Sequence, residues 1–303
     1  MLGRLKPYLQ LVRLPNLFTA AADSLAGFLL VGGALHDARG WGTVVTISIA
    51  LYAAGIVLND IADAAVDARE RPTRPIPSGR VSKRTAVLIL GVCLALVAVV
   101  ALLGGSRQTQ LVALLLALAI LIYDLAAKHS PFGPVSMGLC RTLNLLLGLS
   151  IAPQLGGPVA WLAAASYGLF VAGVTWISRS EVEQRETRGI ALGLTIQNIS
   201  MFGLLLAVLG HSQFPGTGPA RPPIPAGGLA VLALIAICVN LASGRALNEP
   251  TPKSTQTAVK TGIFCLVWLN AALVLAVRGL GPGLIVAALW IPAYFLGKWI
   301  YST

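Results

Sequence analysis

Charged residues are scarce in this sequence: Asp, Glu, Lys and Arg together make up 11% of the 303 residues, and only 11 residues are acidic. An ordinary soluble domain has about 25% charged residues, so this composition excludes one. The four cysteines and three histidines have no partners at the spacing typical of a zinc site. Glycine-rich phosphate loops, nucleophile elbows and CxxC motifs are absent as well, which excludes the enzyme classes that depend on them.

Long apolar runs take the place of the missing charge. Hydrophobic residues make up 56% of the chain, and the mean hydropathy is +0.80. A helix needs about 20 apolar residues to cross the hydrocarbon core. Ten such stretches lie near residues 16–35, 42–62, 84–104, 108–127, 134–153, 158–178, 189–210, 227–244, 257–277 and 283–300. The pattern predicts an all-α polytopic membrane protein, and no cleavage site of a signal peptide follows the first run.

The 22 Lys and Arg residues are unevenly distributed along the chain. With ten spans, Arg39, Arg107, Arg221 and Arg278 fall on one side, and the remaining 18 fall on the side of both termini. Cytoplasmic loops carry an excess of Lys and Arg, so we expect both termini on the cytoplasmic face, in the cytoplasmic membrane of a prokaryote. The net charge of +11 is thus interpreted as a topology signal with contacts to membrane lipids, and a nucleic-acid partner is not expected.

The acidic residues gather at the cytoplasmic ends of the spans, and the largest group is the stretch NDIADAAVDARE, residues 59–70. On a helix, Asp60, Asp63 and Asp67 share one face, and Asn59 borders it. Three adjacent carboxylates near hydrocarbon need positive compensation. Mg²⁺ fits this need, because it takes oxygen ligands and is often shared with a substrate phosphate. The alternative is a solvated helix end that Lys and Arg alone compensate.

A basic loop, RPTRPIPSG at residues 71–79, follows this cluster. Its prolines end the helix and hold the loop in an irregular conformation. Arg71 and Arg74 lie on the loop, and the planar guanidinium group suits phosphate oxygens. Residues 59–79 thus combine carboxylates, an implied metal and arginines at the cytoplasmic end of the second span. This combination predicts a substrate with a diphosphate head and a lipid tail.

The motif NDxxDxxxD followed by RPxRPIxxG, at residues 59–79, resembles the first aspartate-rich motif of the UbiA-type intramembrane prenyltransferases. The resemblance implies a single domain over residues 1–303. Its core of nine transmembrane helices would span about 10–278, with an additional tenth span at about 283–300. The resemblance also implies transfer of a prenyl chain from a Mg²⁺-bound polyprenyl diphosphate to a lipophilic acceptor within the membrane.

Further positions match the family's polar pattern in the stretches RLPN (13–16), YDLAAK (123–128) and RTLN (141–144). The alternative for these positions is an interfacial anchor or a polar residue of helix packing. By resemblance, the metal ligands are Asn59, Asp60, Asp63 and Asp67, the catalytic residues are the same three aspartates with Lys128, and the substrate-binding residues are Asn16, Arg71, Arg74, Tyr123, Arg141 and Asn144.

The segment after the sixth span departs from the family, whose active members usually hold a second Mg²⁺ at another aspartate-rich motif there. This sequence reads TWISRSEVEQRETRG, residues 175–189, without any aspartate. Glu181 is the remaining candidate metal ligand, and Arg179 is a candidate ligand of the diphosphate. The alternative is a solvated, salt-bridged loop. The letters SRSEV in this segment resemble the EboC-like branch of the family.

Two functions therefore stay open. The intact first motif favours a prenyltransferase, and the missing second motif favours a noncatalytic or transport-linked relative that binds a prenyl or phosphate lipid. Two further acids lie within or at the end of spans. Asp23 is interpreted either as a functional residue or as a structural one held by a partner such as Asn144. Asp124 is expected to be either exposed or paired with Lys128, four residues further along, rather than catalytic.

Overall fold

The structure is a computed structural model that describes residues 2–179, 187–215 and 226–301, and this part of the chain is helical without any strand. In chain order its elements are α1 (Leu2–Leu11), α2 (Leu14–Leu30), α3 (Ala38–Ala62), α4 (Ala64–Glu70), α5 (Lys83–Gly104), α6 (Arg107–Ile122), the π-helix η1 (Tyr123–Ala127), α7 (Gly133–Leu149), the 3₁₀ helix η2 (Pro153–Gly156), α8 (Pro158–Arg179), α9 (Thr187–Leu209), the 3₁₀ helix η3 (His211–Gln213), α10 (Ala226–Asn248), α11 (Pro252–Arg278), α12 (Leu280–Ala288) and α13 (Trp290–Tyr301).

The predicted all-α, multi-pass membrane fold is confirmed. In the described residues, eight stretches are long and apolar enough to cross a membrane, namely α3, α5, α6 with η1, α8, α9, α10, α11 and α12 with α13. The remaining two predicted spans are α2 and α7, which have 17 residues each. Most residues of these two helices are buried. Polar side chains can therefore lie on them away from lipid, which is where membrane proteins hold such groups.

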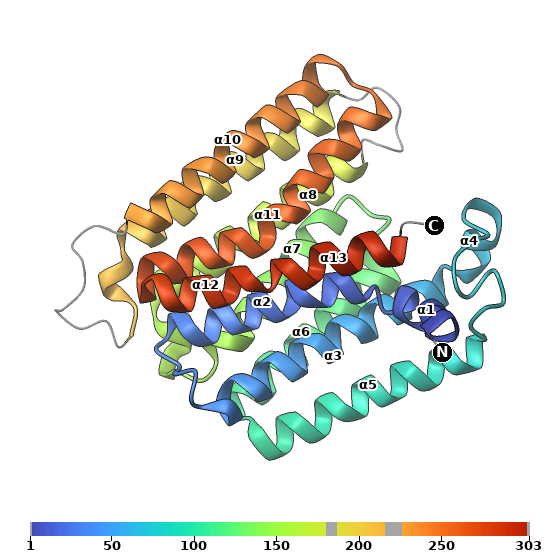
Figure 1. The fold of residues 1–303 in the computed structure, drawn as a ribbon, viewed down its shortest axis with the longest axis horizontal. Coiled ribbons are helices and arrows are strands. Elements are labelled where there is room, and N and C mark those ends of the chain that lie inside the picture. The colour runs from blue at the N-terminus through green and yellow to red at the C-terminus, as the bar shows by residue number, and fades with distance from the viewer. Residues whose placement is uncertain (1, 180–186, 216–225, 302–303) are drawn as a thin grey trace.

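The predicted tenth span is the pair α12 and α13, which Figure 1 shows lying along α2 and α11. The helix breaks at Leu289, and Pro292 near the start of α13 lacks the N–H that a continuous helix would need. Trp290 and Tyr294 stack with ring centroids 4.8 Å apart. The side chain of Gln10 in α1 donates to the backbone oxygen of Ile300, 3.1 Å away. The tenth span thus covers the α2–α11 side of the bundle.

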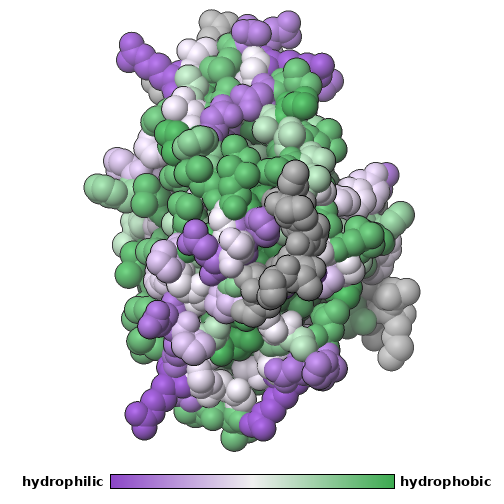
Figure 2. Space-filling view, turned by 90° about the vertical axis from the view of Figure 1, so that its left-hand side faces the viewer, coloured by the Kyte–Doolittle hydropathy of each residue, from purple (hydrophilic) through white to green (hydrophobic). Residues whose placement is uncertain are grey.

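Helix α5 forms the lower edge of the bundle in Figure 1, and α9 and α10 lie at the upper edge. Of its 22 residues, only Ala86 and Ala101 are buried. Figure 2 shows the end of the molecule at the left of Figure 1, where hydrophobic residues cover much of the face and hydrophilic residues form smaller groups between them. Because α5 is strongly apolar and has so few buried residues, we infer that most of its surface faces the hydrocarbon region.

Helices α2 and α7 cross at two glycines, Gly27 and Gly148. A Cβ atom on Gly148 would overlap the backbone oxygen of Ser24, and one on Gly27 would overlap the backbone oxygen of Leu145. Small residues let transmembrane helices approach this closely. The crossing brings the polar side chains of α2 and α7 within hydrogen-bonding distance of each other.

We expect Gly148→Ala to lower the stability of the protein, because the added methyl group forces the α2 and α7 backbones apart. Overpacking of this kind costs about 1–3 kcal/mol. The measurement is the thermal unfolding midpoint in detergent. Gly91→Ala on α5 is the control, since nothing lies within 4 Å of a Cβ at that position. Equal midpoints for the two variants would contradict the close crossing.

Candidate active site

Two of the predicted aspartates share one guanidinium group. Asp60 lies near the end of α3 and Asp67 lies in α4, and both are buried. Nη1 of Arg74 is 3.3 Å from Oδ1 of Asp60 and 2.5 Å from Oδ2 of Asp67. Nη2 of Arg13 is 3.4 Å from the same oxygen of Asp60. The structure therefore brings two acids and two arginines together around one point.

Asp63 faces elsewhere. The helix breaks at this residue, which is the C-cap of α3 and the N-cap of α4. Its Oδ1 lies 2.5 Å from Nζ of Lys128. The expectation that Asp60, Asp63 and Asp67 share the face of one continuous helix is wrong in this detail, because α4 begins a new helix. In the described residues, no three His, Cys, Asp or Glu side chains group as a metal site would.

The loop after α4 carries Arg74 inward and leaves Arg71 exposed. Gly79 has φ of 74° in its turn, a conformation that glycine adopts without strain. Nη1 of Arg80 donates to Oε1 of Gln10, 3.0 Å away, which ties the loop to α1. Within the described chain, no ion pair joins Arg71 to an acid.

A cavity of about 150 Å³ lies between α3, α6 and α7, and Asn59, the residue before Asp60, is part of its lining. Predicted residues that line it are Asn59, Tyr123, Arg141 and Asn144. Arg13 lines both this cavity and an outer one of about 690 Å³ that Asp60, Arg74 and Arg80 also line. Arg13 thus lies between the outer cavity at the acidic mouth and the inner cavity within the bundle.

Arg13 is a site residue that the sequence reasoning did not select, although it is the first residue of RLPN. It adopts a left-handed conformation, φ 47° and ψ 54°, between α1 and α2. Non-glycine residues rarely adopt this conformation, and where they do the strain is often found at functional sites. The neighbouring Asn16, which was predicted, is partly buried, and its backbone oxygen accepts from Thr19. The chain turn at RLPN therefore aims Arg13 at Asp60.

Asp124 is a second residue that the sequence reasoning undervalued. It is buried, lines the inner cavity, and accepts at Oδ1 from Nδ2 of Asn59, 3.1 Å away. The predicted pair between Asp124 and Lys128 is wrong. Asp124 is hydrogen-bonded to Asn59 instead, and Lys128 pairs with Asp63. Asp124 lies within the π-helix η1 and Lys128 is its C-cap, and single π-helical turns of this kind are frequent at functional sites.

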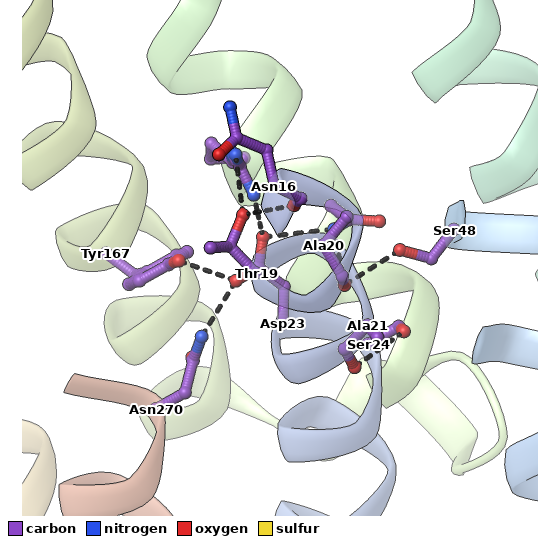
Figure 3. A network of polar contacts seen from close by, with 11 residues as sticks. Asn16, Thr19, Ala20, Ala21, Asp23, Ser24, Ser48, Tyr167 and Asn270 are labelled. Atoms are coloured by element: carbon purple, nitrogen blue, oxygen red, sulfur yellow. Dashed lines mark hydrogen bonds and ion pairs between the residues drawn. The ribbon is translucent and has the colours of Figure 1, made fainter. Parts of the chain in front are cut away.

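A network of hydrogen bonds surrounds Asp23 in the centre of the bundle, as Figure 3 shows. One carboxylate oxygen, Oδ2, accepts from Arg141 at 2.8 Å and from Asn144 at 3.0 Å. The other, Oδ1, accepts from Tyr167 at 2.5 Å and from Asn270 at 2.8 Å. The predicted contact between Asp23 and Asn144 is confirmed. Four helices, α2, α7, α8 and α11, meet at this one fully buried carboxylate.

Arg141 connects this network to the inner cavity. Its Nη2 donates to Thr19, 3.2 Å away, and its guanidinium carbon lies 4.9 Å from the centroid of the Tyr52 ring. Both Arg141 and Tyr52 line the cavity. A guanidinium over an aromatic face is a favourable arrangement. Asp23 and Tyr52 together hold the charge of Arg141 at the cavity wall.

Arg179, which ends α8, lines neither the inner nor the outer cavity. Nη2 of Arg179 donates to the backbone oxygens of Lys128, at 2.5 Å, and Ser130, at 2.6 Å, so it fixes the loop after η1. Glu181 lies outside the described residues. The structure therefore brings together Asn59, Asp60, Asp67, Arg74, Tyr123, Arg141 and Asn144 around the cavity and its mouth.

The fold and this site define a multi-pass helical membrane protein with a cavity, lined by both apolar and polar side chains, next to a cluster of carboxylates and cations. The profile of the UbiA prenyltransferase family matches residues 21–248. The chain therefore belongs to this family, and the enzyme class predicted from the sequence, a prenyltransferase, is confirmed.

Relatives of the chain include several named digeranylgeranylglyceryl phosphate synthase. That of Methanoregula boonei is 27% identical over 276 residues, covering 85% of this chain and 94% of that protein. That of Methanopyrus kandleri is 29% identical over 213 residues, covering 68% and 77%. That of Methanothrix thermoacetophila is 35% identical over 149 residues, and this match spans only about half of each chain, 48% and 55%.

Two solved structures have the same fold. One, described as giving structural and mechanistic insights into digeranylgeranylglyceryl phosphate synthase in membranes, has a TM-score of 0.62 at 20% identity over 91% of this chain and 99% of that chain. The other, a UbiA homolog from Archaeoglobus fulgidus bound to GPP and Mg²⁺, has a TM-score of 0.62 at 16% identity over 86% and 99%. At these identities the similarity establishes the arrangement of the helices.

Proposed function

We propose that this protein transfers a prenyl group from a Mg²⁺-bound polyprenyl diphosphate to a lipophilic acceptor within the membrane. The observation that carries the proposal is the cluster at the cavity mouth, where Asp60 and Asp67 share Arg74 next to a membrane-embedded cavity. The Archaeoglobus fulgidus homolog bound to GPP and Mg²⁺ supports the donor and the metal. The names of the relatives support an acceptor lipid that carries a glycerol phosphate group.

The residues at the mouth fit a divalent cation. One nitrogen of the Arg74 guanidinium group lies between oxygens of two buried carboxylates, so these two acids already face a common cation. Carboxylate and amide oxygens are the ligands that Mg²⁺ prefers. Asp60 and Asp67 would hold the ion, with Asn59 and Asp63 beside them and Glu181 as a further predicted ligand. Bound there, Mg²⁺ would neutralise charge on the diphosphate.

The cations at the mouth would then serve the diphosphate. If Asp60 and Asp67 held the ion, the Arg74 guanidinium group would leave its ion pairs with them and would be free to bind phosphate oxygens. Arg13 contacts Asp60 and Lys128 contacts Asp63, so both would add positive charge at the mouth. Arg71 is exposed beside them. Arg74, Arg13 and Lys128 would thus each exchange a carboxylate for the leaving group.

The reaction exchanges one bond for another. The allylic C–O bond breaks, and its electron pair leaves with the diphosphate. The acceptor forms the new bond to the allylic carbon and loses a proton. The cations at the mouth stabilise the departing charge, which is the effect that contributes most in such sites. Tyr123, Arg141 and Asn144 line the cavity and would orient the reacting groups.

We further propose that both termini and the active-site mouth face the cytoplasm, as the distribution of Lys and Arg favours. In this orientation the diphosphate enters from the aqueous side, and the prenyl chain extends into the hydrocarbon region. The polar mouth lies where α3 ends and α5 begins, together with the loop that joins them.

The test is release of diphosphate by the purified protein in detergent. Geranyl, farnesyl and geranylgeranyl diphosphate are each supplied with and without Mg²⁺. We expect release that requires Mg²⁺ and that an acceptor lipid with a free hydroxyl group accelerates. Donor binding without any release, with or without an acceptor, would contradict catalysis and support the noncatalytic relative that the missing second motif favours.

A further inference from the structure

A second cavity lies beside the candidate active site. It has a volume of about 80 Å³ and lies between α3, α5 and α6. Its lining is wholly apolar and includes Leu58, Leu90, Leu94 and Leu121. Leu90 and Leu94 belong to α5, the helix whose surface is mostly exposed to hydrocarbon. The cavity therefore lies between the interior of the bundle and the surrounding lipid.

Two residues, Gly55 and Ile120, line both this apolar cavity and the inner cavity of the active site. A Cβ atom on Gly55 would lie 2.8 Å from Cγ2 of Ile120, closer than real side chains pack. The Ile120 side chain thus lies against the bare Gly55 backbone and separates the two spaces. Ile120 is only partly buried, so its side chain has room to change rotamer.

The side chains around this separation change in polarity from one cavity to the other. On the inner side, Asp124 and Asn59 are hydrogen-bonded next to the aspartate cluster. On the outer side, apolar side chains alone line the space. Elsewhere in the bundle, α12 and α13 cover α2 and α11. A long apolar chain whose charged head lies at the mouth therefore has an apolar path toward α5.

We propose that the cavity between α3, α5 and α6 holds the distal isoprene units of the prenyl diphosphate, and that Gly55 and Ile120 set the chain length of the donor. This inference rests on the proposed function, since it assigns the tail of the same substrate. A short donor would end at Ile120. A longer donor would displace the Ile120 side chain over Gly55 and continue between α5 and α6.

The experiment compares Gly55→Leu and Gly55→Ala with the wild-type protein. Affinity for geranyl and geranylgeranyl diphosphate is measured by titration calorimetry, and kcat/KM for diphosphate release is measured with both donors. One methylene group too many in an apolar pocket lowers kcat/KM for that substrate by about 10-fold or more. We expect Gly55→Leu to lose at least this factor with geranylgeranyl diphosphate and to change little with geranyl diphosphate. Ile120→Ala should shift the preference toward the longer donor.

The matched control is Gly91→Leu on α5. Gly91 is exposed, and nothing lies within 4 Å of a Cβ there, so both donors should behave as in the wild type. Thermal unfolding midpoints identify a variant that fails to fold, and Gly55→Ala then provides the milder change.

Several results would overturn the inference. Equal losses with both donors would make Gly55 a packing residue only. An unchanged donor preference in all Gly55 and Ile120 variants would remove the cavity from the donor path. A phospholipid retained by the wild type but not by Gly55→Leu in native mass spectrometry, without a change in donor preference, would assign the cavity to a membrane acyl chain. Binding that depends on donor length without turnover would support the inference and contradict the proposed function.

Discussion

Asp63→Ala is expected to abolish the Mg²⁺-dependent release of diphosphate. The Asp63 carboxylate lies 2.5 Å from Nζ of Lys128 and holds that side chain in place. Its removal therefore frees Lys128 and also takes one carboxylate from the proposed metal site. Loss of one preorganised charge-stabilising group costs about 100- to 1,000-fold in rate. The measurement is the initial rate of release from geranylgeranyl diphosphate at saturating Mg²⁺.

Glu70→Ala is the matched control for this change. Glu70 ends α4, the helix that also carries Asp67, but it is exposed and lines neither the inner nor the outer cavity. The control should retain the wild-type rate while it also loses one negative charge. If Asp63→Ala released diphosphate as fast as Glu70→Ala at every Mg²⁺ concentration, the assignment of the aspartate motif to the metal would be wrong.

Asp23→Ala is expected to cause the largest loss of stability. The fully buried carboxylate accepts hydrogen bonds from Arg141, Asn144, Tyr167 and Asn270, and its removal leaves the Arg141 charge buried without its acid. Removing one partner of a buried ion pair costs about 3–5 kcal/mol. The measurement is the unfolding free energy in detergent or lipid bicelles.

The double variant Asp23→Leu with Arg141→Met separates stability from function. It removes both charges of the pair, and such replacements are often neutral or stabilising. We expect it to recover most of the stability that Asp23→Ala loses while diphosphate release stays impaired, because Arg141 lines the cavity. A double variant as unstable as Asp23→Ala would show that the lost hydrogen bonds of Tyr167 and Asn270, rather than the broken ion pair, account for the loss of stability.

The helical spans were largely predictable from the sequence, but the helix break at Asp63 was not. Predicted and observed spans agree because apolar runs of about 20 residues form helices in hydrocarbon whatever their neighbours are. The break at Asp63 was missed because the spacing of Asp60, Asp63 and Asp67 suits one continuous helix equally well. Periodicity describes one helix at a time and does not reveal where the chain turns.

The candidate site was predicted as a set of residues but not as an arrangement. The motif at residues 59–79 identified Asp60, Asp67 and Arg74 as members of one site, and they do lie together. Asp124 was assigned to the wrong partner, because a pair four residues apart is the only contact that a single helix offers it. Its actual partner, Asn59, is 65 residues away in sequence.

The sequence by itself determined that this chain spans a membrane many times and carries an acidic motif at the end of its second span. Both follow from composition and short-range spacing, which are properties of the chain alone. Only the tertiary structure decided which cation faces which carboxylate, that Asp23 holds Arg141, and that an apolar cavity continues past Gly55. These features arise where helices distant in sequence cross, and their geometry depends on the packing of all the helices together.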